Sequence, residues 1–424
     1  YTAGSGGICM KCSSNLFFIF LKIFGSLMFS YSLELYFIYS MFISNKNYIK
    51  LFLAHDTVAE TKIKIKQKYY FGIQLNLLMN FIQFTSIIFM YAQYTYLDVF
   101  SLVSQIKSTL NFFSDPSTQQ SSSVECLLLA LGVDPNDITY FKIQYWEILP
   151  FVKLVLTFII IYILHWNGKI KRLKDTLITS TFALILNEQP SLVLNLARFS
   201  SCFLTETDGY GYVQIQPAIK CSDPYYQNFL LYYVMPALIF WGGVIPLSLF
   251  VVLFRKRDML NDIDVRKTYG GMINSYKGTV YFWGLITMIC KLVFILPLSL
   301  ITDSTAAFQT SVIIMLLYFT LHLLLEPYNH KEFLRIEKFS ILTYIITLFL
   351  LANASTEFYG KMSLKILLLV GLINVAMLIY ILSQIVRKYR MSKRSGRFTI
   401  TNNELAGFLN ANEEKNNDMK SLIL

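Results

Sequence analysis

Glu188 and Lys291 are the ionisable residues that lie deepest within the long apolar stretches of this sequence. Each is about eleven or twelve residues from one end of its stretch, roughly 16–18 Å along a helix that rises 1.5 Å per residue. Charges near the middle of a bilayer are costly, and they are usually paired or functional. Because the two charges are opposite, we predict an intramembrane ion pair. Its favoured role is structural, and the alternative is a part in permeation or gating.

Polar side chains recur at helical spacing around these charges, one set on the face of Glu188 and another in the stretch 72–96. Such side chains usually join helices by hydrogen bonds worth ~0.6 kcal/mol each, but grouped in one bundle they could line a wet groove. The candidates for a polar lining are Thr181, Ser191, Asn195, Asn76, Asn80 and Gln83. Lys153 and Arg198 lie nearer the ends of their stretches, where we expect them to reach the membrane surface.

Motifs of catalysis or metal binding are absent from the sequence. There is no HExxH, GxSxG or paired-Asp motif, and His322 is predicted to lie at the membrane interface. The pair Cys9 and Cys12 lacks the second CxxC or the histidines of a zinc site. We therefore expect no enzymatic activity, no catalytic residue, no metal and no cofactor.

The elements that must position these residues are long apolar helices. Of the 424 residues, 55% are apolar and only 15% are charged, which excludes an ordinary soluble enzyme. Stretches of about 18 or more apolar residues predict membrane helices. They are 15–42, 72–96, 149–166, 176–201, 229–254, 279–301, 308–325, 338–355 and 363–386. The predicted fold is an all-α, polytopic transmembrane helical bundle of about nine spans, with kinks at Pro236 and Pro246.

The net charge of +11 indicates how this bundle is oriented. With the N-terminus outside, 25 Lys and Arg residues fall in the inner loops and in the tail up to Arg397, and five fall outside. Positive charge collects on the cytoplasmic side of membrane proteins. We therefore predict an N-out, C-in topology and no nucleic-acid partner.

Cysteines give a second indication of sidedness. Five of the six lie outside in this topology, where disulfides persist, and Cys290 lies within a span. We predict a Cys202–Cys221 disulfide that closes the small outer loop 202–228. The three others, Cys9, Cys12 and Cys126, are an odd number, so at least one pairs upstream or with another chain, or stays free.

The segments that flank the bundle differ from it in composition. Residues 1–14 are rich in Gly and Cys and read as the end of an extracellular cysteine-rich repeat region, so we expect a longer surface protein. Residues 15–386 form the bundle, with a small outer cap over 97–148. We expect the cytoplasmic tail 387–424 to be basic at first and disordered toward its end. Basic residues beside a membrane attract anionic lipid by about 1 kcal/mol each, or act only as a stop-transfer anchor. The lipid-binding candidates are Arg387, Lys388, Arg390, Lys393 and Arg394.

Three stretches, Leu196–Phe229, Tyr269–Phe294 and Leu317–Leu342, together with the SSSVECLLLALGVDP segment of the cap, carry a resemblance to a known family. They resemble the multi-pass C-terminal membrane region of large protist, especially ciliate, surface proteins with furin-like cysteine-rich repeats. The resemblance implies a large cysteine-rich ectodomain upstream. It also implies a layout like that of transient-receptor-potential (TRP) channels, shared by some mating-type recognition proteins. The family tends to have Trp-Glu at the start of the sixth span, but Gly284 follows Trp283 here, so that carboxylate's role does not carry over.

We therefore expect a membrane anchor and signal-relay domain of a cell-surface recognition protein, in the plasma or ciliary membrane. Its expected partners are the lipid bilayer, the upstream ectodomain, and other membrane or surface subunits. The alternative is a TRP-like cation or mechanosensitive channel, although Thr356–Met362 is too short for a pore loop between the last two spans. A seven-helix receptor would require dismissing two good apolar stretches.

Overall fold

The computed structural model describes residues 2–3, 9–10, 16–53, 59–95, 124–135, 137–170, 172–204, 209–260, 262–354 and 363–395. Most of the predicted segment 1–14, much of the cap 97–148, the turn Thr356–Met362 and the tail after residue 395 lie outside these residues. Within 1–14, strands β1 (Thr2–Ala3) and β2 (Cys9–Met10) pair antiparallel.

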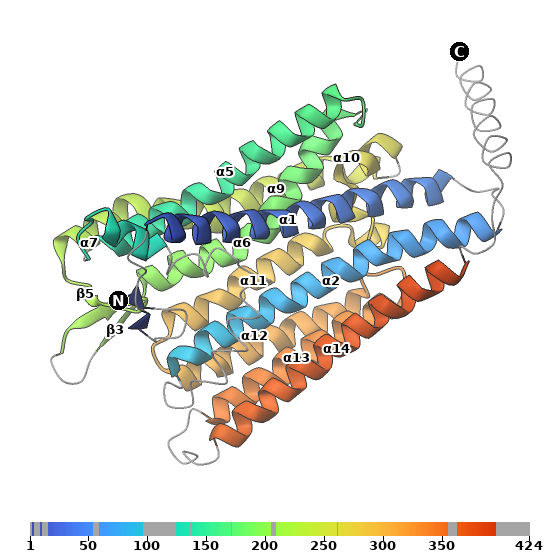
Figure 1. Ribbon diagram of the computed structural model, residues 1–424. Coiled ribbons are helices and arrows are strands. Elements are labelled where there is room, and N and C mark those ends of the chain that lie inside the picture. Colours follow the sequence, from blue (N-terminus) through green and yellow to red (C-terminus); the bar gives the residue numbers. More distant parts are fainter. Residues whose placement is uncertain are drawn as a thin grey trace.

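Long helices run side by side along most of the molecule (Figure 1). The first four are α1 (Leu16–Leu53), α2 (Ala59–Thr95), α5 (Ile138–Trp166) and α6 (Leu173–Ser200). The last four are α11 (Trp283–Leu300), α12 (Ser304–Leu325), α13 (Lys331–Ala354) and α14 (Ser363–Ser395). Between these groups, α10 (Ile263–Ile273) is short and is preceded by the 3-10 turn η4 (Arg257–Met259); the 3-10 turn η5 (Gly278–Val280) leads into α11.

The predicted fifth span is interrupted twice. It consists of α7 (Pro224–Phe229), α8 (Met235–Ile239) and α9 (Ile245–Arg255), joined by the π-helical turns η2 (Leu230–Val234) and η3 (Phe240–Val244). Pro236 and Pro246 are each the second residue after a π-helical turn. Proline lacks the N–H that an α-helix needs, and a wider turn before it absorbs the missing hydrogen bond.

Eight helical segments of the described chain are long and apolar enough to cross a membrane. They begin with Leu16–Lys50 and end with Lys365–Lys388, which identifies the chain as a multi-pass membrane protein by length and composition. Helix α13, which covers the predicted span 338–355, is not one of the eight. Its first turns carry Glu332, Arg335 and Glu337, although it packs between α12, α14 and α2 inside the bundle. A ninth crossing stays a prediction.

The bundle has two distinct ends, which we name by their short elements (Figure 1). The hairpin end carries β3 (Cys202–Leu204), β4 (Gly211–Val213) and β5 (Gln216–Lys220), and the α10 end carries α10. The three strands form an antiparallel sheet in the order β3-β4-β5, where the sequence predicted only a loop. Cys202 and Cys221, the pair predicted from the sequence, form a disulfide with a sequence separation of 19.

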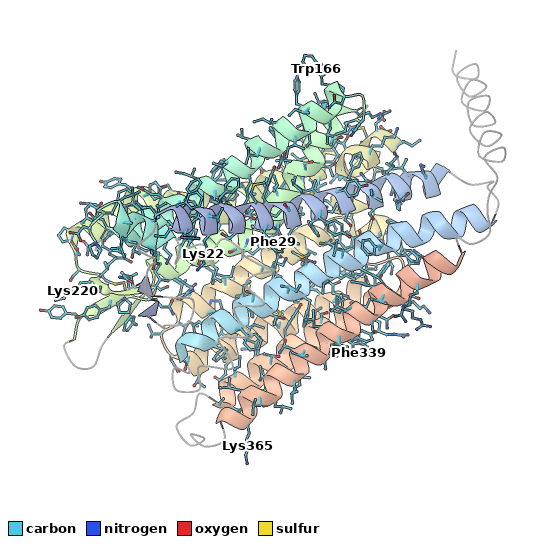
Figure 2. All side chains as sticks on the ribbon, viewed as in Figure 1. Lys22, Phe29, Trp166, Lys220, Phe339 and Lys365 are labelled. Carbon is cyan, nitrogen blue, oxygen red and sulfur yellow. A yellow bond between two sulfur atoms is a disulfide. The ribbon has the colours of Figure 1, made fainter. Side chains whose placement is uncertain are left out.

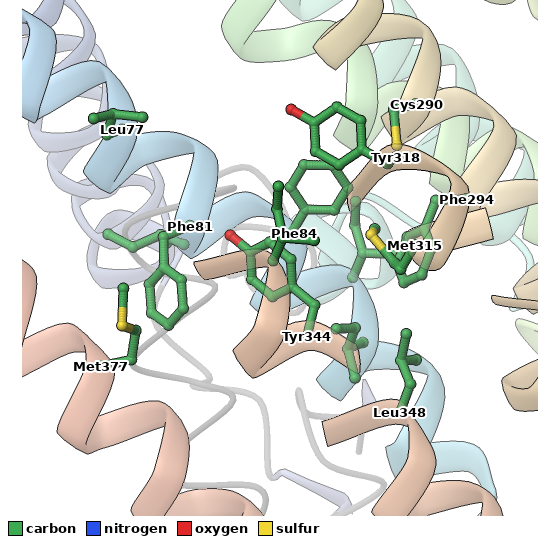
Figure 3. Close-up of a cluster of buried hydrophobic side chains, with 14 of the residues drawn as sticks. Leu77, Phe81, Phe84, Cys290, Phe294, Met315, Tyr318, Tyr344, Leu348 and Met377 are labelled. Carbon is green, nitrogen blue, oxygen red and sulfur yellow. The ribbon is translucent and has the colours of Figure 1, made fainter. Parts of the chain in front are cut away.

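Aromatic side chains fill the core between α2, α11, α12, α13 and α14. The ring of Tyr344 packs between Phe81 and Phe84, with ring centroids 5.6 and 5.0 Å away (Figure 3). Other large apolar side chains, such as Phe29 and Phe339, point outward from the bundle (Figure 2). An apolar outer surface of this extent is what lipid tails require.

Candidate functional site

A buried ion triad joins three helices in the middle of the bundle. Lys153 on α5 donates to Glu34 Oε1 on α1 at 2.5 Å and to Glu188 Oε1 on α6 at 2.9 Å. The Lys153 side chain is only 2% exposed, so the expected reach to the membrane surface is wrong. The reason is that α5 begins at Ile138, well before the predicted span start at 149, which places Lys153 in the middle of its helix.

The predicted Glu188–Lys291 ion pair is wrong, because each residue has other partners. Lys291 on α11 donates to Asn80 Oδ1 at 2.7 Å and to Gln83 Oε1 at 2.5 Å, both on α2. At its depth in the bundle Lys291 faces α2, while Glu188 faces α5 and α1. Apolar stretches locate the depth of a residue but not the direction in which its helix is turned.

Amide side chains connect the two charges instead. Gln83 Nε2 donates to Asn187 Oδ1 on α6 at 3.2 Å, and the Asn187 side chain hydrogen-bonds the neighbouring Glu188 carboxylate. Lys291 is thereby linked to Glu34 through Gln83, Asn187, Glu188 and Lys153. We call these six residues the polar chain; it crosses α11, α2, α6, α5 and α1.

A small cavity of about 40 Å³ lies beside the polar chain. The predicted lining residues Asn76, Asn80 and Gln83 do line it, together with Asn187, Thr287 and Lys291. The other predicted candidates lie elsewhere on α6. Thr181 bonds back to the Leu177 carbonyl and Asn195 is buried at 5% exposure, while Ser191 is half-buried. This volume has room for about three water-sized particles, far less than a continuous pore.

A second buried network surrounds Glu337 on α13. Its carboxylate accepts from Tyr318 Oη at 2.8 Å and Trp283 Nε1 at 3.4 Å, and His322 Nε2 lies 3.3 Å away. His322 is 2% exposed, so it is buried within the bundle, and its predicted depth at the membrane interface stays a prediction. Neither Glu337 nor Glu34 was among the predicted site residues. The spacing Tyr318–His322, one turn apart on α12, is a signal for this network that the sequence contains.

At its end of the bundle, α10 is held by α1 and α6. Asn45 Nδ2 on α1 donates to the Lys267 carbonyl at 2.8 Å, and Asn274 Nδ2 donates to Asn45 Oδ1 at 2.5 Å. Gly270 on α10 packs so closely that an added methyl group would overlap Asn45 and Asn274. On the other side, Thr179 Oγ1 of α6 donates to the Thr268 carbonyl at 3.0 Å.

Charged residues extend this contact into the loop before α6. Arg172 lies 2.7 Å from Asp264 of α10, and Lys267 lies 3.4 Å from the same carboxylate. Hydrogen bonds from Arg172 and then Lys267 lower the pKa of Asp264 below its usual value. Asp264 is largely exposed, so this pair orients the loop more than it stabilises the fold.

The lipid-binding candidates lie at the C-terminal end of α14. Lys388 is 2.7 Å from Glu332 of α13 and lies over the Tyr70 ring, so it is engaged within the bundle. Arg387 and Arg390 are exposed. Lys393 and Arg394 belong to the helix, but their side chains lie outside the described residues.

The described cysteines occur in two bonding states. Cys126 is disulfide-bonded, as are Cys202 and Cys221, while Cys290 is a buried free thiol. Among the described residues, no group of three or more His, Cys, Asp or Glu side chains is arranged to hold a metal ion.

Comparisons with known proteins yield one partial similarity. A stretch of 170 residues is 26% identical to cysteine repeat modular protein A of Toxoplasma gondii and covers 37% of this chain but 5% of that protein. No protein-family model and no solved structure matches the chain. The similarity links the chain to a far longer cysteine-repeat protein, and the ciliate and mating-type parts of the resemblance stay predictions.

Proposed function

We propose that this chain is the membrane anchor and signal-relay unit of a large cell-surface recognition protein. The single observation that carries the proposal is that α6 contacts both ends of the bundle. This helix joins the disulfide-bonded hairpin through Cys202 at one end and contacts α10 through Thr179 at the other. Its 28 residues span about 42 Å, more than the ~30 Å hydrocarbon core of a bilayer.

Helix α1 supports the same route in parallel. It begins at Leu16, near the hairpin end where an upstream ectodomain would join, and reaches α10 through Asn45 (Figure 1). Packed helices move as rigid bodies between discrete arrangements. A force applied at the hairpin end would therefore reach α10 through two helices that the Glu34–Lys153–Glu188 triad holds together.

The proposed location is the plasma or ciliary membrane, with the hairpin end outside. A disulfide persists in extracellular surroundings, and the basic loops around α10 favour the cytoplasmic side. The partial similarity to a cysteine-repeat protein supports an upstream cysteine-rich ectodomain. Further membrane or surface subunits would be recognised through that ectodomain.

Hydrogen exchange of the chain in lipid nanodiscs tests the relay. An antibody fragment raised against the segment 211–220 serves as a surrogate ligand at the hairpin. The proposal predicts a change in the exchange rate of α10 amides when this fragment binds. A matched fragment against the C-terminal tail should leave α10 unchanged. If the fragment slows amide exchange only in the hairpin, the chain would be an anchor that does not relay a signal to α10.

Ion conduction is the second candidate, favoured by the polar chain that crosses five helices. The cavity of about 40 Å³ is small for a pore, which weakens this candidate. Planar bilayers containing the purified chain should show no unitary currents under the relay proposal. Currents that disappear in Glu188→Gln would instead favour a TRP-like or mechanosensitive conductance.

A further inference from the structure

Lys291 is a buried cation whose observed partners are neutral. It is 4% exposed, and its ammonium donates to the amide oxygens of Asn80 and Gln83. In the part of the chain that the structure describes, no carboxylate oxygen lies within 4 Å of this ammonium. Glu337 acts on it from farther away, and its own carboxylate is held by Tyr318 and Trp283.

The hydrogen bonds around Lys291 leave donors, rather than acceptors, near the cavity. An ammonium has three N–H donors, and two of them are used. Because Asn80 turns its oxygen toward Lys291, its NH₂ group is directed elsewhere. Gln83 also accepts from Lys291 and passes its own donor on to Asn187. Among the described residues around the cavity, the third N–H of Lys291 and the NH₂ group of Asn80 are therefore the donors left for an occupant, since the Gln83 and Asn187 amides are used within the polar chain.

Size and charge together define what this cavity would hold. Its volume of about 40 Å³ suits a monatomic anion with one or two waters, but not a polyatomic organic anion. A buried ammonium is costly unless an opposite charge compensates it. We propose that the cavity beside Lys291, Asn80 and Asn187 is a halide-binding site, with chloride as its natural occupant.

A halide at this place would join three helices. Lys291 belongs to α11, Asn80 to α2 and Asn187 to α6, so the anion would be shared by the elements that enclose the cavity. The folded bundle binds the ion and the unfolded chain does not. Halide binding therefore stabilises the folded state by mass action.

Thermal unfolding of the full chain in nanodiscs tests this site. The melting temperature is measured in sodium chloride, sodium bromide and sodium gluconate at equal ionic strength. The proposal predicts a saturable rise of about 1–3 °C in chloride or bromide at tenfold excess over Kd, and none in gluconate. Identical curves in all three salts would overturn the site and leave a water-filled cavity.

Two variants assign the effect to Lys291. Lys291→Met should abolish the halide dependence. Asn80→Asp places a carboxylate oxygen where the Asn80 amide oxygen now lies, 2.7 Å from the ammonium, so an internal anion replaces the halide. This variant should fold and lose the halide dependence, while the exposed control Asn353→Asp should keep it. If Lys291→Met does not fold, a persistent halide shift in Asn80→Asp overturns the proposal.

Discussion

At the scale of single residues, buried charges in this bundle are satisfied by partners that sequence position alone does not reveal. The sequence correctly placed Glu188, Lys291, Asn80 and Gln83 inside the bundle, because polar residues near the middle of an apolar stretch usually face the interior of a bundle. It paired Glu188 with the wrong lysine, since the rotation of each helix about its axis depends on packing with its neighbours. Glu34 lies at helical spacing with Lys22, Ser26 and Ser30 in the first apolar stretch, a pattern that predicts hydrogen bonds between helices but not a particular cation as its partner.

Removing Lys153 should destabilise the protein strongly. Lys153→Met leaves Glu34 and Glu188 buried without their cation, and breaking a buried ion pair in this way costs about 3–5 kcal/mol. Thermal unfolding in detergent measures the loss. The matched control is Lys22→Met, which removes an exposed lysine of α1 and should change little.

The same triad allows a rescue. Adding Glu34→Gln and Glu188→Gln to Lys153→Met removes both uncompensated carboxylates and should recover much of the lost stability. Combining Glu188→Lys with Lys291→Glu should not restore the stability that either single charge reversal loses, because these two residues are not in contact. If Lys153→Met were as stable as Lys22→Met, the buried triad would be disproved.

At the scale of elements, the apolar stretches predicted most helices, and their ends were the least accurate part. Helix α5 begins at Ile138 rather than 149, and the predicted outer loop contains a three-stranded sheet. The sequence does not predict this sheet, because its strands are only three to five residues long. Strands this short show no clear alternation of apolar and polar residues. The Gly270–Gly271 pair, a sequence typical of turns, lies within helix α10.

Close packing of α10 on α1 should make Gly270 intolerant of a side chain. Within a helix, Gly→Ala normally gains up to about 1 kcal/mol, but here the methyl group would overlap Asn45 and Asn274. We expect Gly270→Ala to lose about 1–3 kcal/mol in thermal or chemical unfolding. Gly242→Ala is the control, since nothing lies within 4 Å of its added methyl group. Equal stabilities for the two variants would refute the close contact.

The hairpin should depend on its disulfide. Replacing Cys202 and Cys221 by Ser opens a loop with a sequence separation of 19, and a loop of this size is worth about 3 kcal/mol of chain entropy. Faster protease cleavage within 203–220, with the helices intact, is the expected result. Cys290→Ala, a buried free thiol elsewhere, should leave the cleavage rate unchanged. Equal cleavage in both variants would mean that the strands hold the hairpin without the disulfide.

At the scale of the whole molecule, composition alone indicated a multi-pass membrane protein, and eight apolar helical segments agree with it. The number of crossings is harder to derive, because α13 combines charged first turns with a position inside the bundle. The distribution of Lys and Arg predicts the orientation of the bundle. What the sequence could not supply is the route by which the two ends are connected, since that requires knowing which helices reach α10.

The relay across the membrane rests on the hairpin end and the α10 end facing opposite sides of one bilayer. Single cysteines introduced as Asp134→Cys, in the segment before α5, and Lys171→Cys, between α5 and α6, report on the two ends in intact cells. A membrane-impermeant maleimide, compared with the parent chain, should label Asp134→Cys from outside and Lys171→Cys only after permeabilisation. Labelling of both positions from outside would contradict the predicted topology and, with it, the relay.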